Sequence, residues 1–240
     1  MPASVEASAG AGLEVRGMRC ERGGRTLFDA LDFDVPAASA LTVVGPNGSG
    51  KTTLLRALAG LTETSMRRIA WKHEPVAIRS AAWRSQLAYI GHKPGHKDEL
   101  SVGENLELAC ALEGGLATAA DRRRVLGEVG LAARGDLPVK RLSQGQKQRL
   151  ALARLALSMR ALWLLDEPAG ALDVDARALL GAILGRHLAR RGVAVIATHD
   201  PIDLAGACTT QLRLGARDVR ALATAHAQDA AITAGQVDAC

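Results

Sequence analysis

The chain has 240 residues, 48% of them hydrophobic, and a formal net charge of +5 at neutral pH. This length suits one α/β domain with a sizeable core. No run of about 18 apolar residues is free of charged ones, so no segment is expected to span a membrane on its own. Aromatic residues make up only 2% of the chain, which argues against binding single-stranded nucleic acid by base stacking.

The charge and the cysteines narrow the class of protein further. The basic excess suits nucleic acid, anionic lipid or a nucleotide as a partner, or simply an arginine-rich surface in contact with water. The four cysteines are far apart and form no CxxC pair, so neither a disulfide framework nor a zinc site is expected, and a reducing cytosol suits the chain. The first twelve residues lack the basic start and apolar run of a secretory signal.

The first quarter of the chain predicts short strands, one buried strand and a helix. Residues 13–15 and 31–35 alternate apolar and polar side chains, and residues 22–25 between them have the composition of a turn. Residues 41–44 form a continuous apolar run, as a buried parallel strand would. Leucines then recur at helical spacing over residues 54–61, which predicts a helix.

The remainder predicts helices that alternate with strands. Helices are expected over residues 100–134, with a break at Gly114 and Gly115, and over residues 144–159. Residues 161–165 and 192–197 are apolar runs that predict buried strands. This alternation indicates a parallel sheet with right-handed crossover connections.

A glycine-rich loop between the buried strand and the first helix carries the strongest chemical signal. Residues 45–52 fit the pattern G-x-x-x-x-G-K-[ST], in which glycines let successive backbone N–H groups point at phosphate oxygens. The helix that follows adds its positive N-terminal end. Lys51 is expected to reach the β and γ phosphates, and Thr52 to offer a hydroxyl to Mg²⁺. The alternative is an accidental glycine-rich turn, which the position between strand and helix disfavours.

Two further motifs have both a functional and an ordinary explanation. Asp166 ends a predicted strand, where a carboxylate can hold Mg²⁺, and Glu167 next to it could polarise an attacking water. An Asp-Glu pair after an apolar run is otherwise a solvated turn. Ser143 and Gly145 open a predicted helix and could form a second anion site, but Ser143 could also be a simple N-cap.

Together these motifs resemble the ABC ATPase family. The motifs that carry the resemblance are the Walker A segment at 45–52, the signature at 142–146, the Walker B strand at 162–166 followed by Glu167, a D-loop-like segment at 171–173, and a switch histidine at His199. Their order and spacing match from about residue 13 to 215. The resemblance implies an α/β P-loop NTPase fold with a mixed core sheet, an N-terminal antiparallel β subdomain and a small α-helical signature subdomain.

The resemblance also implies a division of the chain and a set of site residues. The ATPase domain would cover residues 13–220, with its helical subdomain at about 93–158, and residues 221–240 would be a flexible tail. The implied catalytic residues are Glu167, His199 and Lys51. The implied ATP-binding residues are Gly45, Pro46, Asn47, Gly48, Ser49, Gly50, Lys51, Thr52, Thr53, Arg22, Ser143, Gly145 and Gln146. The implied metal-side residues are Thr52, Asp166 and His92.

Three positions depart from the family pattern. His92 stands where most members carry a glutamine, Arg22 where many stack an aromatic ring on adenine, and Gln144 where a glycine is commoner in the signature. A guanidinium plane at Arg22 could stack on adenine instead. These departures leave the roles of His92 and Arg22 open.

The segments 20–23, 91–95 and 97–100 narrow the resemblance to the ATP-binding subunits of haem exporter complexes for c-type cytochrome biogenesis. This implies ATP and Mg²⁺ as cofactors, a second copy in an ATP-sandwich dimer, and integral membrane permease subunits at the cytoplasmic face of the inner membrane. No nucleic acid and no direct haem binding are expected. The alternatives are an ABC ATPase for another cargo, such as a lipid or drug, and a soluble ABC ATPase that acts on ribosomes or DNA.

Overall fold

The computed structural model describes residues 12–114, 117–199, 202–204, 207–215 and 221–222. The strands are β1 (Leu13–Arg22), β2 (Arg25–Val35), β3 (Ser39–Val44), β4 (Arg68–Trp71), β5 (Glu74–Pro75), β6 (Leu87–Ile90), β7 (Leu162–Asp166), β8 (Val193–Ala197), β9 (Cys208–Arg213) and β10 (Ala221–Leu222). The helices are α1 (Lys51–Leu58), α2 (Ala81–Arg84), α3 (Val102–Leu112), α4 (Ala119–Glu128), α5 (Gln144–Leu157) and α6 (Val174–Ala189), with 3₁₀ turns at Ala132–Arg134 and Val139–Arg141.

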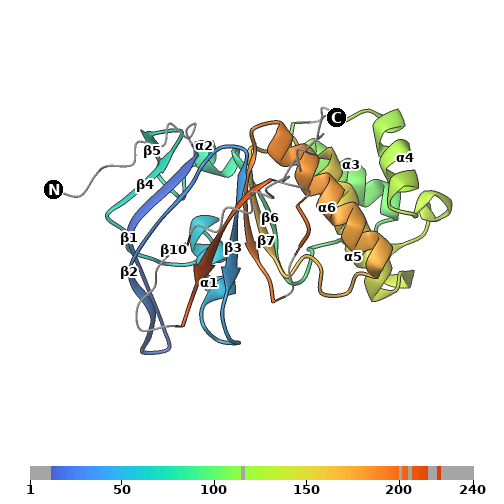
Figure 1. The fold of residues 1–240 in the computed structure, drawn as a ribbon. Coiled ribbons are helices and arrows are strands. Elements are labelled where there is room, and N and C mark those ends of the chain that lie inside the picture. Colours follow the sequence, from blue (N-terminus) through green and yellow to red (C-terminus); the bar gives the residue numbers. More distant parts are fainter. Residues whose placement is uncertain (1–11, 115–116, 200–201, 205–206, 216–220, 223–240) are drawn as a thin grey trace, which may run out of the picture.

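Two sheets form the body of the molecule (Figure 1). The antiparallel sheet has the strand order β2-β1-β4-β5, and the central sheet has the order β10-β9-β3-β8-β7-β6. Strands β9, β3, β8, β7 and β6 of the central sheet are parallel, while β10 pairs antiparallel to β9. Helices α3 to α6 gather at the side of the central sheet away from the antiparallel sheet. The expected α/β fold, with its mixed core sheet, antiparallel β part and helical part, is confirmed.

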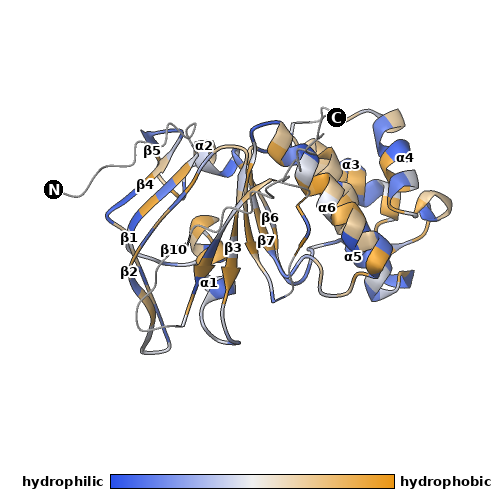
Figure 2. Ribbon diagram, viewed as in Figure 1, coloured by the Kyte–Doolittle hydropathy of each residue, from blue (hydrophilic) through white to orange (hydrophobic). Residues whose placement is uncertain are grey.

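The central sheet is buried on both faces, which explains its continuous apolar strands (Figure 2). Successive side chains of a strand point to opposite faces. In β7, Leu162 and Leu164 pack in one core with α1 and the antiparallel sheet. Trp163 and Leu165 pack in the other core with α3 to α6. Residues 41–44, 162–165 and 193–197 therefore lie in strands, as expected, whereas Ala161 and Gly192 directly precede β7 and β8.

Several elements differ in extent from the sequence prediction. Strands β1 and β2 run to a two-residue turn at Gly23 and Gly24, whose φ angles of 59° and 73° suit a tight hairpin. The helical region expected over residues 100–134, with its break at Gly114 and Gly115, contains the two helices α3 and α4. Gly114 after α3 has a φ of 109°, and Gly115 lies outside the described residues. Strand β10 extends the sheet into the first two residues of the expected tail, and residues 223–240 lie outside the described part of the chain.

Candidate ATP-binding and hydrolysis site

Four parallel strands bring the sequence motifs together at one edge of the central sheet. Because carboxyl ends of parallel strands meet at the same edge, the segments that follow them become neighbours. The register pairs Val43 of β3 and Asp166 of β7 with Ala197 of β8. It also pairs Ile90 of β6 with Leu165 of β7. The Walker A loop, Asp166 and Glu167, the segment after β8, and the segment after β6 therefore lie side by side.

The Walker A loop has the backbone of a phosphate cradle. Gly45, Gly48 and Gly50 have φ angles of 153°, 81° and 101°, in the region that favours glycine. At Gly45 a Cβ atom would lie 2.5 Å from the carbonyl oxygen of Leu214, so only glycine fits there. Gly50 is the N-cap of α1 and offers no side-chain cap, which leaves the first N–H groups of the helix available to an anion.

Lys51 is held inside this loop rather than on the surface. The residue is buried, with 7% of its surface exposed. Its Nζ donates to the carbonyl oxygens of Gly45 (2.8 Å) and Pro46 (3.3 Å). The Nζ also lies 3.0 Å from Nε2 of His199. Since a lysine ammonium can only donate, Nε2 of His199 accepts in this contact. Nε2 of His199 lies 3.4 Å from Oε1 of Glu167, so the three predicted catalytic side chains form one cluster.

Glu167 occupies a strained position at the end of β7. Its φ of 52° is unusual for a residue with a side chain. The backbone N–H of Glu167 donates to the carbonyl oxygen of Ala197 (2.8 Å), and its carbonyl accepts from Gly170 N–H (3.2 Å), which fixes this geometry. Backbone strain of this kind concentrates at functional sites, and here it turns the carboxylate towards His199.

Thr52 and Asp166 fit a magnesium site. The Thr52 hydroxyl donates to Oδ1 of Asp166 at 3.1 Å. Asp166 is 2% exposed, and its Oδ2 atom is buried without a hydrogen-bond partner in the described structure. An orphaned carboxylate oxygen beside a hydroxyl is the oxygen donor set that Mg²⁺ takes in nucleotide sites, where substrate phosphates and water complete its shell. Magnesium would serve there to neutralise charge on the phosphates.

Two of the three departures from the family pattern, His92 and Arg22, lie on segments next to this edge. His92 is exposed and lies two residues beyond Ile90, the last residue of β6, which pairs with Leu165 of β7. Arg22 is exposed at the tip of the β1–β2 hairpin. Strand β2 of that hairpin approaches the Walker A loop, because a Cβ atom at Gly50 would lie 3.4 Å from Leu27 and Phe28. The segments that carry both positions thus lie near the cradle, although no hydrogen bond or ion pair within the described part of the chain joins either side chain to the loop.

The segment predicted to be a second anion site, around Ser143 and Gly145, is separate from the Walker A loop. Ser143 is the N-cap of α5, with a capping box in which its Oγ accepts from Gln146 N–H (3.3 Å) and Gln146 Oε1 accepts from Ser143 N–H (3.0 Å). Ser143 therefore caps the helix, the ordinary explanation, while Ser143 and Gln144 are exposed and Gly145 and Gln146 are half-buried. A Cβ atom added at Gly145 would lie 3.5 Å from the carbonyl oxygen of Ala171. Within the described residues no hydrogen bond links this segment to the Walker A loop.

The signature helix is fastened to the segment that follows Glu167. Gln148 donates from Nε2 to the buried carbonyl oxygen of Pro168 at 3.1 Å. Arg149 places NH2 2.8 and 2.7 Å from the two carboxylate oxygens of Asp173, which is also the N-cap of α6. The segment at Ser143 is thus connected through α5 to Pro168, the residue that follows Glu167, and to the start of α6. The sequence motifs gave no role to Gln148 or Arg149.

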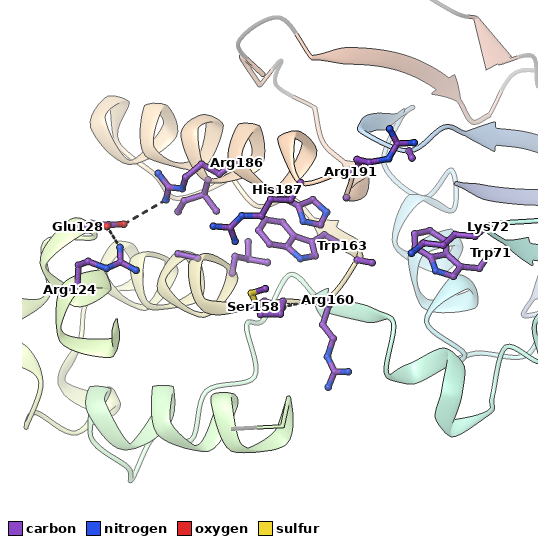
Figure 3. A pocket seen from close by; sticks show the side chains of 18 residues that line it. Trp71, Lys72, Arg124, Glu128, Ser158, Arg160, Trp163, Arg186, His187 and Arg191 are labelled. Carbon is purple, nitrogen blue, oxygen red and sulfur yellow. Dashed lines mark hydrogen bonds and ion pairs between the residues drawn. The ribbon is translucent and has the colours of Figure 1, made fainter. Parts of the chain in front are cut away.

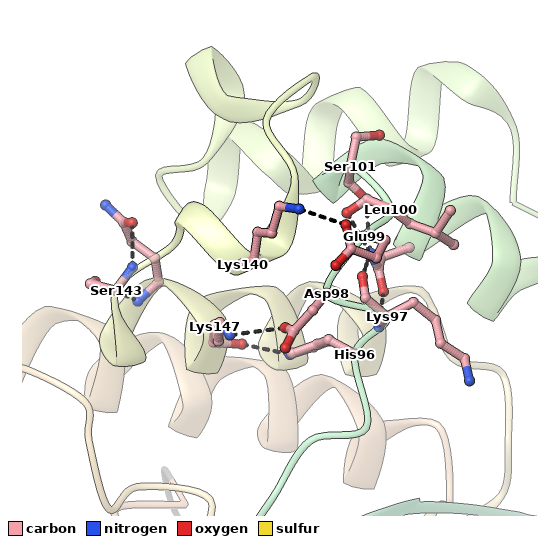
Figure 4. A network of polar contacts seen from close by, with 11 residues as sticks. His96, Lys97, Asp98, Glu99, Leu100, Ser101, Lys140, Ser143 and Lys147 are labelled. Atoms are coloured by element: carbon pink, nitrogen blue, oxygen red, sulfur yellow. Dashed lines mark hydrogen bonds and ion pairs between the residues drawn. The ribbon is translucent and has the colours of Figure 1, made fainter.

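A segment that precedes α3 holds the other side of the signature helix (Figure 4). Nε2 of His96 donates to the carbonyl oxygen of Lys147 at 2.8 Å, and Nζ of Lys147 donates to Asp98 at 2.9 Å. Lys140 pairs with Glu99 at 2.6 Å. Burial lowers the pKa of His96 to about 4, so its ring is neutral and the donor nitrogen is Nε2. These contacts connect the segment after His92 to α5.

A strand-edge phosphate cradle with an adjacent carboxylate and threonine defines a P-loop nucleotide-binding protein. Residues 28–170 match the family model described as ABC transporter. The chain belongs to the ABC transporter family. A solved structure described as an ATP binding subunit of an ABC transporter has a TM-score of 0.76 and 25% identity, and covers 88% of this chain and 90% of its own.

Curated relatives are similar over most of the chain. The cytochrome c biogenesis ATP-binding export protein CcmA of Dechloromonas aromatica is 43% identical over 203 residues, which cover 85% of this chain and all of the relative. The protein of the same name from Pseudomonas aeruginosa is 42% identical over 204 residues, again 85% of this chain and all of the relative. In the described residues, no helix is long and apolar enough to cross a membrane.

Proposed function

We propose that this chain is the ATP-hydrolysing subunit of an ABC transporter that powers a haem export or delivery step in c-type cytochrome biogenesis. The observation that carries the proposal is the cluster of Lys51, Glu167 and His199 at the Walker A loop, in a chain 43% identical to a cytochrome c biogenesis ATP-binding export protein. The relatives' names support the pathway, and the cluster supports hydrolysis rather than mere ATP binding. Haem as cargo rests on the resemblance of segments 91–95 and 97–100.

The phosphates of ATP bind the Walker A loop. Backbone N–H groups of residues 45–53 and the ammonium of Lys51 meet the β and γ phosphate oxygens. Thr52 and Asp166 hold Mg²⁺ beside them. His92, at the end of the neighbouring strand, takes the place of the family's glutamine on the metal side. Arg22 stacks its guanidinium plane on the adenine.

Glu167 acts as the general base. Its carboxylate orients a water molecule and accepts a proton as the water oxygen bonds to the γ phosphorus, while the bond to the β-phosphate oxygen breaks. His199 holds the γ phosphate and fixes the Glu167 side chain, which it already approaches to 3.4 Å. Lys51 exchanges its carbonyl partners for phosphate oxygens, so its charge stabilises the transferred group.

A second copy completes the site. Ser143, Gly145 and Gln146 lie apart from the Walker A loop of their own chain, and their exposed helix N-terminus suits a phosphate. In a face-to-face dimer, this segment of one copy binds the γ phosphate held by the other copy. The hydrogen bonds of α5 to Pro168 and Asp173 would then transmit closure of the dimer from the Ser143 segment to Glu167.

The membrane work falls to separate chains. We place this subunit, as a peripheral protein, at the cytoplasmic face of the inner membrane, with two permease subunits that handle haem. The runner-up is the same ATPase serving another exported cargo, and the identity of the membrane protein that co-purifies with it would separate the two. A soluble ABC ATPase acting on ribosomes or DNA is disfavoured because relatives that match 85% of this chain over their whole length carry the export name.

The Glu167→Gln variant tests the hydrolytic role. It should bind ATP as the wild type does and lose roughly 100- to 10,000-fold in turnover, since only the general base is removed. It should also accumulate as an ATP-bound dimer on size-exclusion chromatography. The control is Glu63→Gln, which removes an exposed carboxylate far from the cradle. Steady-state hydrolysis near the wild-type rate in Glu167→Gln would refute the assignment.

A further inference from the structure

A cavity of about 680 Å³ lies at the end of the central sheet opposite the nucleotide site (Figure 3). It is lined at the amino ends of β7 and β8 by Trp163 and Gly192, whereas the nucleotide site is at the carboxyl ends of these strands. The C-terminal ends of α5 and α6 form its walls. Its volume is that of a small-molecule site, and neither the proposed ATP site nor the signature uses it.

The floor of the cavity is a neutral aromatic pair. The rings of Trp163 and His187 stack at 3.9 Å with an interplanar angle of 11°. Nε2 of His187 contacts the carbonyl oxygen of Val193 at 3.1 Å, and burial keeps this ring uncharged by lowering its pKa to about 4. Trp163 is 2% exposed, and its N–H has no hydrogen-bond partner in the described structure. A buried donor without an acceptor is costly.

The walls carry a large excess of positive charge. Six cationic side chains line the cavity against one carboxylate, and the cations are Lys72, Arg124, Arg160, Arg186, Arg190 and Arg191. The carboxylate, Glu128, is already shared between Arg124 and Arg186. The guanidinium of Arg160 donates to the carbonyl oxygens of Ser85 and Leu112, and its Nε lies 3.8 Å from Glu113, which does not line the cavity. The side chains of Lys72, Arg190 and Arg191 have no hydrogen bond or ion pair to the described residues, and the Nζ atom of Lys72 lies 5.8 Å from the centre of the Trp71 ring.

We propose that this cavity binds a phosphate-bearing anion. Cations of one sign that line a concavity repel one another and focus their field on it more than they would on a solvated convex surface. Guanidinium groups bind phosphate oxygens in pairs, and a phosphate brings more charge per volume than a carboxylate. Leu155, Ile183 and the 64% exposed Met159 add an apolar wall. The ligand therefore has an anionic phosphate end and an apolar part, as in a lipid headgroup region or a soluble organic phosphate.

Pyrophosphate and lipid vesicles distinguish the two sources. The full chain is saturated with MgADP, which occupies the Walker A loop, and is then titrated with pyrophosphate by calorimetry. In parallel it is sedimented with vesicles of phosphatidylglycerol or of phosphatidylcholine. The test variant is Arg190→Ala with Arg191→Ala. The control is Arg123→Ala with Arg134→Ala, which removes two exposed arginines outside the cavity.

We expect the wild type and the control to bind, and the test variant to lose at least tenfold in affinity while its ATP affinity stays unchanged. Binding of pyrophosphate supports a soluble phosphate, and binding of phosphatidylglycerol vesicles alone supports a lipid headgroup. Binding of neither probe by the wild type, or an equal loss in test and control variants, would overturn the proposal. If the test variant loses ATP binding through misfolding, Lys72→Ala replaces it, because Lys72 lies in a surface turn. These outcomes do not depend on the hydrolytic role of Glu167.

Discussion

The buried histidine of α6 gives the chain a stability that depends on pH. His187 is 7% exposed, stacks on Trp163 and contacts the carbonyl oxygen of Val193. Burial lowers its pKa to about 4 in the folded chain. In the unfolded chain an ordinary histidine has a pKa of about 6.5. Between these two values the unfolded state binds the proton and the folded state does not, so acid favours unfolding.

The size of the effect follows from the two pKa values. At pH 7.5 neither state is protonated at His187, and the residue makes no pH-dependent contribution. At pH 5 the unfolded state is protonated and the folded state is still neutral, which costs about 2 kcal/mol, or about 1.4 kcal/mol for each of the 1.5 pH units crossed. The free energy of unfolding should therefore fall by about this amount between pH 7.5 and pH 5 because of His187 alone.

Urea unfolding followed by circular dichroism measures this difference. In His187→Phe the aromatic ring is kept and the titration is removed, so the loss between pH 7.5 and pH 5 should be smaller by about 2 kcal/mol than in the wild type. The missing contact to Val193 lowers the stability of the variant equally at both pH values and cancels. His96→Gln is a parallel variant, since the pKa of His96 is also lowered to about 4 by burial. Equal losses in wild type and His187→Phe would refute the reasoning.

Three further substitutions probe the proposed site. Lys51→Ala removes a charged donor from the phosphates and should weaken ATP binding or turnover roughly 10- to 100-fold; unchanged calorimetric affinity and phosphate release would mean that residues 45–52 are only a turn. Ser143→Arg should leave ATP binding by the monomer intact and abolish dimer-dependent hydrolysis, because bulk there blocks closure; lost binding in the monomer would contradict the face-to-face arrangement. Arg149→Ala should cost about 1 kcal/mol or less in urea unfolding, since Asp173 is solvent-exposed, yet reduce turnover at saturating ATP. Full turnover would show that the Arg149–Asp173 pair does not couple α5 to the catalytic carboxylate.

The nucleotide edge could be predicted from the sequence because its residues belong to local motifs. The glycines of residues 45–50 predict a tight loop, and the apolar run before Asp166 predicts a buried strand. Neighbouring parallel strands then bring these two segments together. The register then places Asp166 beside Ala197 without any further signal. What the motifs could not supply is the contact between Lys51 and His199, which are far apart in the chain.

The parts that escaped prediction depend on tertiary packing. The sequence prediction has no helix over residues 174–189. The apolar residues of α6 are distributed around the helix rather than along one face, and Gly181 and Gly185 resemble helix breaks, so this segment has no clear helical pattern. Gly181 is present because a Cβ atom there would lie 2.5 Å from the carbonyl oxygen of Asp203. The contacts of His96 and Gln148 use remote backbone carbonyls, which no residue spacing marks. The charged cavity likewise joins residues from separate helices and turns.

The central claim is that ATP hydrolysis by this chain drives c-type cytochrome maturation. The most direct measurement replaces the wild-type gene by the Glu167→Gln variant in the host and stains gels of membrane fractions for covalently bound haem, with a Glu63→Gln strain as the control. We predict that c-type cytochromes disappear from the Glu167→Gln strain while spectra show normal b-type cytochromes, because this subunit supplies energy and does not make haem. Wild-type amounts of c-type cytochromes in a strain whose purified variant has no ATPase activity would contradict the account.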